Sequence, residues 1–290
     1  MRVSVVQMNP GADKAANIAQ AARLIDSAME ADRPDLIALP EMWTCLGGDR
    51  AAKQAAAEVL PPQGSNEPGG PAYGFLRRVA RERGIHVHGG SLGEQAADGA
   101  RLFNTTVVFS PRGAEVARYR KIHLFDITTP DGQGYRESAS YGGGEDVVTF
   151  DADGIRVGCA ICYDLRFPEL FLALRRAGAA LILLPSAFTV PTGRDHWEVL
   201  IRARAIETQC WMAAPATWGR HRDGAGQDRF TYGRSLVCDP WGQAVSTVSD
   251  GVGWTTARID LALLGRVRRD MPVLEHRRDD IFRAKGSQPA

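Results

Sequence analysis

Cys162 stands at the end of an apolar run, at the point where the chain turns polar. The run covers residues 155–161 and predicts a buried strand, and residues 168–177 have the spacing of a helix. A thiol between a strand and a helix can be held at a fixed geometry and still be reached from solvent. A helix N-terminus behind the thiol favours thiolate over thiol. The sequence therefore predicts a cysteine nucleophile and, with it, a covalent hydrolase.

Cys159 and Cys162 also have the CxxC spacing of a redox or metal-binding pair, so a thiol redox protein is an alternative. Side chains alternate along a strand, which places Cys159 on the opposite face from Cys162. The sequence has no second Cys or His pair at zinc spacing, and no carboxylate-rich segment accompanies His86 and His88. We therefore expect neither a disulfide between these thiols nor a metal site.

Glu41 and Lys121 are the candidates for a base and a cation beside the thiol. Glu41 follows an apolar strand over residues 35–39, at the carboxyl end where α/β sheets place ligand sites. Lys121 shares one face of an extended segment with Tyr119 and His123, which predicts an inward-facing ammonium that needs an anionic partner. A thiol, a carboxylate and an ammonium together favour attack on a carbonyl or nitrile carbon. A non-catalytic scaffold, the remaining alternative, would typically lack one of the three.

Two similar series of elements position these residues. Each runs strand, helix, strand, and is followed by a further helix and strand. This alternation predicts an α/β fold of two sheets packed face to face with helices outside. We also expect hairpins over 104–120 and 235–247 and a loop over 131–144. The first series covers residues 3–8, 17–31, 35–39, 72–83 and 85–88, and the second covers 155–161, 168–177, 180–184, 197–208 and 211–214.

The composition is that of an ordinary soluble globular protein: 290 residues, 44% hydrophobic and 24% charged. A formal net charge of +1 gives no reason to expect nucleic acid or an anionic membrane as a partner. The sequence has no bilayer-spanning run, and five cysteines without an export signal fit a reducing cytoplasm. We predict a single domain over 1–290, with a tail from about residue 270 that packs on the surface or on a partner subunit.

Three motifs at suitable separations resemble those of the nitrilase (carbon–nitrogen hydrolase) superfamily, and the resemblance extends over nearly the whole chain. They are Leu-Pro-Glu ending at Glu41, Tyr-Arg-Lys-Ile-His-Leu-Phe around Lys121, and Gly-Cys-Ala-Ile-Cys-Tyr-Asp around Cys162. The resemblance implies that Glu41 is the general base and Cys162 the nucleophile. It also implies that Lys121 and the backbone N–H of Tyr163 hold the oxyanion. Glu137, in the loop after the lysine, matches a supporting glutamate, and no metal or organic cofactor is implied.

Residues 162–170 and 185–193 resemble, more narrowly, the branch that includes deaminated glutathione amidases and ω-amidases. This implies an amidase that cleaves a small carboxylate-bearing amide through a thioester. The best candidate is deaminated glutathione, which would give 2-oxoglutarate and Cys-Gly. Action on 2-oxoglutaramate, or another amidase, nitrilase or carbamoylase activity, is the alternative. The implied fold is a four-layer αββα sandwich that pairs into an αββα–αββα homodimer or a larger homo-oligomer.

Arg166, four residues after Cys162, is placed to bind a substrate carboxylate. The other interpretation of Arg166 is a helix-surface salt bridge to Glu169 or Asp164. Arg234 stands where close relatives often have His, and it would alter the preferred acid if it borders the pocket. Three further residues follow the strand expected beside that of Cys162 and are predicted to line the pocket: Phe188, Thr189 and Trp197.

Overall fold

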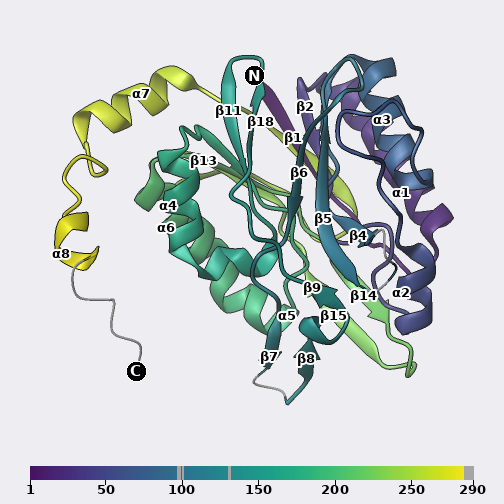
Figure 1. Ribbon diagram of the computed structural model, residues 1–290. Coiled ribbons are helices and arrows are strands. Elements are labelled where there is room, and N and C mark those ends of the chain that lie inside the picture. The colour runs from purple at the N-terminus through teal and green to yellow at the C-terminus, as the bar shows by residue number, and fades with distance from the viewer. Residues whose placement is uncertain (97–98, 100, 130–131, 284–290) are drawn as a thin grey trace.

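The computed structural model describes residues 1–96, 99, 101–129 and 132–283. Two β-sheets face each other, and helices cover the outer face of each sheet (Figure 1). Helices α1 (Lys14–Ala31) and α3 (Pro71–Arg83) cover one sheet, and α4 (Pro168–Arg176) and α6 (Glu198–Thr208) cover the other. This arrangement confirms the predicted four-layer αββα fold.

The first sheet is built on three parallel strands from the N-terminal part of the chain. Val3 lies opposite Leu36, and Leu36 lies opposite His86, so the carboxyl ends of β1, β2 and β3 meet at one edge. The order is β18–β1–β2–β3–β5–β4, and β6 and β9 also pair with β5. The strands are β1 (Arg2–Gln7), β2 (Leu36–Ala38), β3 (His86–His88), β4 (Leu92–Gln95), β5 (Leu102–Phe109), β6 (Glu115–Arg120), β9 (Tyr141–Gly142) and β18 (Gly253–Arg258).

The second sheet repeats this plan. β11, β12 and β13 are parallel, with Val157 opposite Leu181 and Leu181 opposite Trp211. The two series predicted from the sequence are therefore confirmed, as is the late hairpin, here β16–β17. The sheet has the order β10 (Thr149–Ala152), β11 (Ile155–Cys159), β12 (Leu181–Leu183), β13 (Trp211–Ala214), β16 (Leu236–Cys238) and β17 (Ala244–Thr247).

Two small hairpins lie outside the main sheets, at the lower end of the molecule in Figure 1. One is β7 (Asp126–Thr128) with β8 (Gly134–Arg136), and the other is β14 (Trp218–Arg222) with β15 (Asp228–Tyr232). The predicted loop over 131–144 is therefore partly wrong, because it contains β8, a 3₁₀ turn at Glu137–Ala139 and β9. β9 forms by pairing with β5, about 40 residues earlier in the chain, and local sequence patterns do not reveal that pairing.

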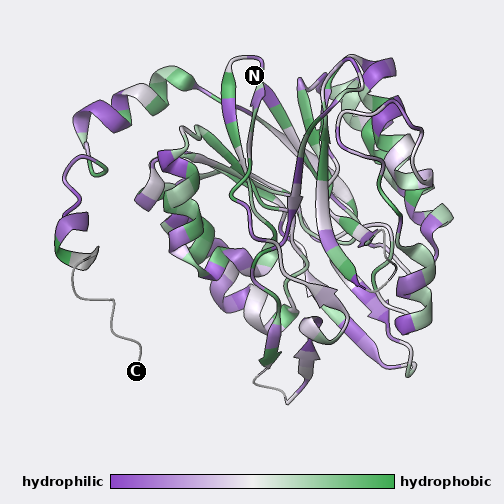
Figure 2. Ribbon diagram, in the orientation of Figure 1, coloured by the Kyte–Doolittle hydropathy of each residue, from purple (hydrophilic) through white to green (hydrophobic). Residues whose placement is uncertain are grey.

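Alternate residues of the central strands belong to different cores. Val5 and Ala38 pack in the cluster between the two sheets, which includes Leu181 of the second sheet. Their neighbour Ile37 packs under the first helical layer with Ile25 of α1. Both faces of the strands are covered, which explains their continuous apolar runs. In Figure 2 the covering helices alternate between hydrophilic and hydrophobic residues, as expected for helices with one face on a sheet and the other in solvent.

The remaining helices lie around this sandwich: α2 (Arg50–Ala56), α5 (Val190–Thr192), α7 (Leu261–Asp270) and α8 (Asp279–Arg283), with a π-helical segment over Gly193–Trp197 between α5 and α6. The tail beyond Asp270 contacts the second helical layer, since Gln209 donates a hydrogen bond to the carbonyl of Met271 (2.6 Å) and Asp279 pairs with Arg176. Residues 284–290 lie outside the described part of the chain. The single domain over 1–290 stays a prediction.

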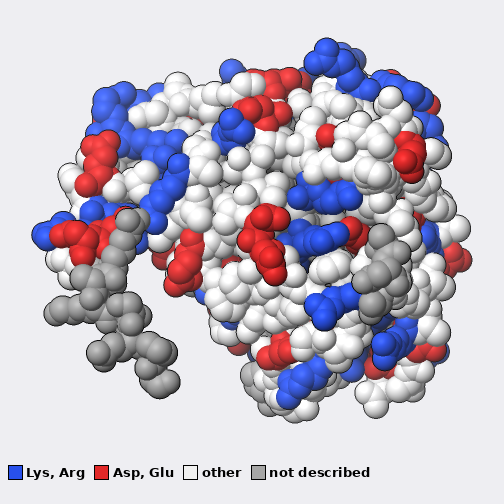
Figure 3. Space-filling view, viewed as in Figure 1, with Lys and Arg blue, Asp and Glu red and all other residues white. Residues whose placement is uncertain are grey.

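The surface carries charges of both signs. Basic and acidic side chains are interspersed on the face shown in Figure 3, as a formal net charge of +1 allows. Among the described residues, none of the helices has the length and apolar character required to cross a membrane.

His88 in β3 makes stability depend on pH. It is fully buried, its ring nitrogens have no hydrogen-bond partner among the described residues beyond its own backbone, and burial lowers its pKa to about 3 from 6.5. The folded state therefore excludes the proton that the unfolded chain accepts below pH 6.5. Above pH 6.5 the neutral imidazole of His88 causes no loss of stability. As the pH falls from 6.5 towards 3, the free energy of unfolding decreases by up to about 1.4 kcal/mol per pH unit, because only the unfolded chain binds the proton.

We expect His88→Phe to flatten the decrease in melting temperature between pH 6.5 and pH 4 relative to the wild type. The matched control is His276→Gln, because His276 is exposed. Thermal unfolding followed by circular dichroism checks the prediction, and an unchanged pH slope in His88→Phe would contradict it.

Candidate active site

Cys162 begins a 3₁₀ turn (Cys162–Arg166) directly after Ile161, at the carboxyl end of β11. Its backbone has φ +46°, a left-handed conformation that is uncommon for a residue with a side chain. Its N–H donates to the carbonyl of Pro185 (3.0 Å), which follows β12. Such strain typically persists at functional sites, where the surrounding structure over-determines the backbone. The predicted turn at the end of the strand is confirmed.

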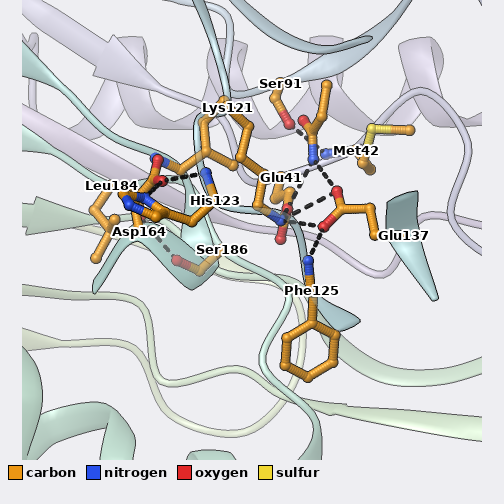
Figure 4. Close-up of polar contacts among 12 residues, drawn as sticks. Glu41, Met42, Ser91, Lys121, His123, Phe125, Glu137, Asp164, Leu184 and Ser186 are labelled. Atoms are coloured by element: carbon orange, nitrogen blue, oxygen red, sulfur yellow. Dashed lines mark hydrogen bonds and ion pairs between the residues drawn. The ribbon is translucent and has the colours of Figure 1, made fainter. Parts of the chain in front are cut away.

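Lys121 follows β6 and points into the space between the sheets, where its side chain is 2% exposed. Its Nζ donates to Glu41 Oε1 (3.0 Å) and to Glu137 Oε2 (2.8 Å) and Oε1 (3.1 Å), as Figure 4 shows. Burial alone would lower the pKa of Lys121, but the two carboxylates outweigh it and hold the pKa well above its usual value. The predicted inward-facing ammonium has its anionic partners, and it is charged.

Asn104 in β5 fixes the two carboxylates in place. Its Nδ2 donates to Glu41 Oε1 (2.9 Å) and to Glu137 Oε1 (3.1 Å), and Glu137 Oε2 accepts the backbone N–H of Phe125 (2.7 Å). We did not predict Asn104 from the sequence. A signal was present, because Asn is depleted in strands and Asn104 shares its face of β5 with Val108, which packs between the sheets.

The pKa of the Cys162 thiol is raised well above its usual value. Burial is the main cause, followed by the negative charge of Glu41 and a hydrogen bond to it, and these outweigh the opposing effect of Lys121. Burial and Glu41 therefore oppose the thiolate-favouring effect expected of the N–H groups at the start of the turn. The raised pKa favours the neutral thiol, so Cys162 needs a base to become a nucleophile, which is the role predicted for Glu41.

Asp164 connects the segment of Lys121 to the turn of Cys162. Its Oδ2 accepts from the hydroxyl of Tyr119 (2.6 Å) and the backbone N–H of Ile161 (2.8 Å). Its Oδ1 accepts from the backbone N–H of His123 (3.1 Å) and lies 2.7 Å from His123 Nδ1. Tyr119 and His123 flank Lys121 in the chain. The buried carboxylate of Asp164 therefore fixes the position of the ammonium relative to the thiol.

We expect Tyr119→Phe to lower kcat by roughly 10-fold, because it removes one hydrogen bond to a charged group from this connection. Tyr73→Phe is the matched control: its hydroxyl also donates to a buried carboxylate (Glu115, 2.7 Å), but on the other face of the first sheet. The two variants should lose similar stability, and only Tyr119→Phe should lose turnover. Equal loss of kcat in both variants would contradict a positioning role for Asp164.

A cavity of about 460 Å³ joins these groups. Its walls include five of the residues predicted to take part in the chemistry, namely Glu41, Lys121, Glu137, Cys162 and Tyr163. Phe188 and Thr189 line the cavity as predicted. The arrangement brings an acid–base group, a cation and a thiol to one buried point that opens to the outside.

Trp197 and Arg166 are placed differently from the prediction. Trp197 is 1% exposed, packs against Phe188 (ring centroids 4.9 Å apart) and donates to the carbonyl of Arg234, so it supports the wall and does not line it. The guanidinium of Arg166 lies over the rings of Tyr163 and Phe188, behind the cavity wall, and contacts His196 Nδ1 (3.3 Å). The side chain of Arg234 is exposed and outside the cavity.

Several cavity residues were not predicted, because they come from elements that the sequence did not reveal. Tyr135 belongs to β8, Arg229 and Phe230 belong to β15, and Lys53 belongs to α2. Within the described ranges, the structure has no group of three His, Cys, Asp or Glu side chains that could hold a metal ion.

The model of the carbon–nitrogen hydrolase family matches residues 2–269, so the chain belongs to this family. This confirms the predicted class of enzyme, a hydrolase of carbon–nitrogen bonds. Among curated proteins, the chain is 41% identical to the deaminated glutathione amidase of Homo sapiens over 287 residues, which cover 97% of this chain and 83% of that protein.

Solved structures agree with this assignment. The chain superposes on Saccharomyces cerevisiae Nit3, a member of branch 10 of the nitrilase superfamily, with a TM-score of 0.84 at 31% identity, and 96% of each chain is covered. The Caenorhabditis elegans NitFhit protein gives a TM-score of 0.85 at 34% identity, with 97% of this chain covered. The chain spans 65% of the length of the NitFhit chain.

Proposed function

We propose that this protein is a cysteine-dependent amidase that hydrolyses deaminated glutathione to 2-oxoglutarate and Cys-Gly. The observation that carries the proposal is the convergence of Cys162, Glu41 and Lys121 in one buried cavity. The substrate is supported by the similarity to deaminated glutathione amidases. A neutral thiol next to a carboxylate suits attack on an amide, because the carboxylate can receive the thiol proton and pass it to the departing amine.

In the first half of the reaction, Glu41 takes the proton of Cys162 as Sγ bonds to the amide carbon. The negative oxygen that forms accepts hydrogen bonds from Lys121 Nζ and the backbone N–H of Tyr163, each worth about 3–4 kcal/mol of transition-state stabilisation. Tyr163 suits this role because the first N–H groups of a helical turn have no acceptor within the turn. The carbon–nitrogen bond then breaks, and the proton on Glu41 goes to the amine.

In the second half, Glu41 removes a proton from water, which attacks the thioester. The carbon–sulfur bond breaks, the proton returns to Cys162 Sγ, and the carboxylic acid is released. Glu137 keeps Lys121 in place throughout, since it accepts two of the ammonium's short contacts (2.8 and 3.1 Å). It also keeps Lys121 charged while Glu41 carries a proton, because an ammonium buried without a carboxylate is costly.

The substrate has a carboxylate at each end, and cations on the cavity wall suit it. Lys53 and Arg136 line the cavity, and we assign the α-keto acid end to these two cations. The guanidinium of Arg166 supports the rings of Tyr163 and Phe188, so Arg166 would affect binding of the α-keto acid end through the positions of these rings. It would contact the substrate directly only after its side chain turned around Phe188.

The test is release of 2-oxoglutarate and Cys-Gly from deaminated glutathione by the purified protein. 2-Oxoglutaramate, whose leaving group is ammonia, is the comparison substrate. A kcat/KM for deaminated glutathione that exceeds the value for 2-oxoglutaramate supports the proposal. Faster hydrolysis of 2-oxoglutaramate makes the protein an ω-amidase, and failure on both compounds overturns the assignment to this branch.

We also propose that the protein forms a homodimer. α6 exposes Val199 (65% exposed) and Ile206 (49%), and Trp241 is 53% exposed, so apolar side chains gather on and near the outer face of the second helical layer. Light scattering coupled to gel filtration tests this.

Five free cysteines support the expected reducing, cytoplasmic compartment.

A further inference from the structure

A second cavity of about 410 Å³ lies beside the catalytic cavity, between the β7–β8 and β14–β15 hairpins. The two cavities have four wall residues in common: Tyr135, Thr189, Arg229 and Phe230. The space at Cys162 therefore continues outwards as a groove between the hairpins. We propose that this groove is the leaving-group subsite, where Arg229 binds the carboxylate of a peptide-like amine. This rests on the proposed amidase function and specifies the class of amine that is released.

Arg229 is held in position before any ligand binds. Its Nε pairs with Asp223 Oδ2 (3.1 Å), its Nη1 donates to Gln133 Oε1 (3.4 Å), and its guanidinium lies 4.9 Å from the centre of the Tyr135 ring. The Tyr135 hydroxyl donates to the same Gln133 oxygen (2.9 Å). These contacts leave further guanidinium N–H groups able to donate to a carboxylate, and a fixed guanidinium loses little entropy on binding.

The charges around the groove allow an anion to bind. Asp223 accepts the backbone N–H groups of Ala225 and Gln227 (3.0 and 2.9 Å), and these hydrogen bonds lower its pKa. It therefore remains a carboxylate and stays paired with Arg229 through Nε, which leaves the other guanidinium nitrogens for a ligand. Asp228, which lines the groove, faces Arg220 (3.4 Å) and Arg222 (3.8 Å). Its charge is therefore offset by two cations, and Arg229 is the cation directed at the shared wall.

The groove also fits the order of the proposed reaction. The amine leaves first, while the acyl half is still bonded to Cys162, so the amine half must lie on the side that leads outwards. Phe230 is 52% exposed at this side, and Tyr135 packs on Phe125, which in turn contacts Tyr163 next to the nucleophile (5.1 Å between ring centroids in each pair). An ammonia leaving group would use none of these contacts. A peptide-like amine would use them all.

The experiment compares deaminated glutathione with its C-terminal glycinamide analogue, which lacks only the distal carboxylate. In the wild type, the free acid should have the higher kcat/KM. Arg229→Gln should lower the ratio of the two kcat/KM values by about 10–100-fold, mainly through KM for the free acid, as expected for a hydrogen bond to a charged group. Arg156→Gln is the matched control, because Arg156 also pairs with an aspartate (Asp151, 3.1 Å) and lies outside both cavities.

The outcomes separate this subsite from the proposed function. If the wild type does not hydrolyse deaminated glutathione, the proposed function fails, and the subsite fails with it. If the wild type hydrolyses it and Arg229→Gln keeps the wild-type ratio, the subsite alone is overturned. An equal loss on both substrates, with a lowered melting temperature, would assign Arg229 a structural role and would also overturn the subsite.

Discussion

Replacing Cys162 with alanine is expected to lower kcat for deaminated glutathione by roughly 10⁴-fold or more, because the acyl group then has no sulfur beside Glu41 to bond to. The remaining groups could still polarise the amide, but they could not divide its hydrolysis into two steps. Steady-state release of 2-oxoglutarate measures the loss. In the wild type, mass spectrometry of protein quenched during turnover should find the acyl group on the peptide that contains Cys162.

Cys159→Ala is the control for this prediction. Cys159 is three residues earlier, is fully buried in β11, and burial raises its pKa to about 12. Its loss should affect stability and leave acylation in place. Cys45 is an internal check, because it is a second thiol on the wall of the catalytic cavity. Acylation of Cys45 in place of Cys162, or turnover that persists in Cys162→Ala, would make the assignment of the nucleophile wrong.

The main elements could be predicted because their signals are local. The apolar runs that became β1, β2, β11 and β12 are buried on both faces. α1 begins directly after Asp13, which caps it by accepting the N–H groups of Ala15 and Ala16. Elements such as β18 and the β14–β15 hairpin were not predicted. β18 exists because it pairs with β1, about 250 residues earlier in the chain, and no local pattern shows that pairing.

The candidate site could be predicted in its residue types and only partly in its electrostatics. Strand alternation correctly placed Lys121 inward, with Tyr119 buried on the same face. For the Cys162 thiol, the sequence indicated the helix N-terminus, which is a local feature, but not the burial that raises its pKa, which depends on how the two sheets pack. The direction of Trp197 was missed for a similar reason: its position follows from the chain, but its indole N–H points to the carbonyl of Arg234, 37 residues later.

Glu41→Gln and Lys121→Met are expected to shift the pKa of the Cys162 thiol in opposite directions, although both should lower kcat by at least about 10³-fold. Glu41 raises this pKa through its charge and its hydrogen bond, so Glu41→Gln should lower it. Lys121 opposes that effect, so Lys121→Met should raise the pKa further. The pH dependence of alkylation by iodoacetamide, followed on the Cys162 peptide with Cys45 as reference, reports the direction.

Stability should separate the same two variants. Glu41→Gln leaves the Lys121–Glu137 ion pair intact (2.8 Å), so its melting temperature should change little. Lys121→Met leaves Glu41 and Glu137 hydrogen-bonded to the same Asn104 amide with no cation between them, and an uncompensated buried charge costs about 3–5 kcal/mol. Alkylation midpoints that move in the same direction in both variants would contradict this account. A thiol poised by Glu41 against Lys121 requires opposite shifts, because each variant removes one of the two opposing charges.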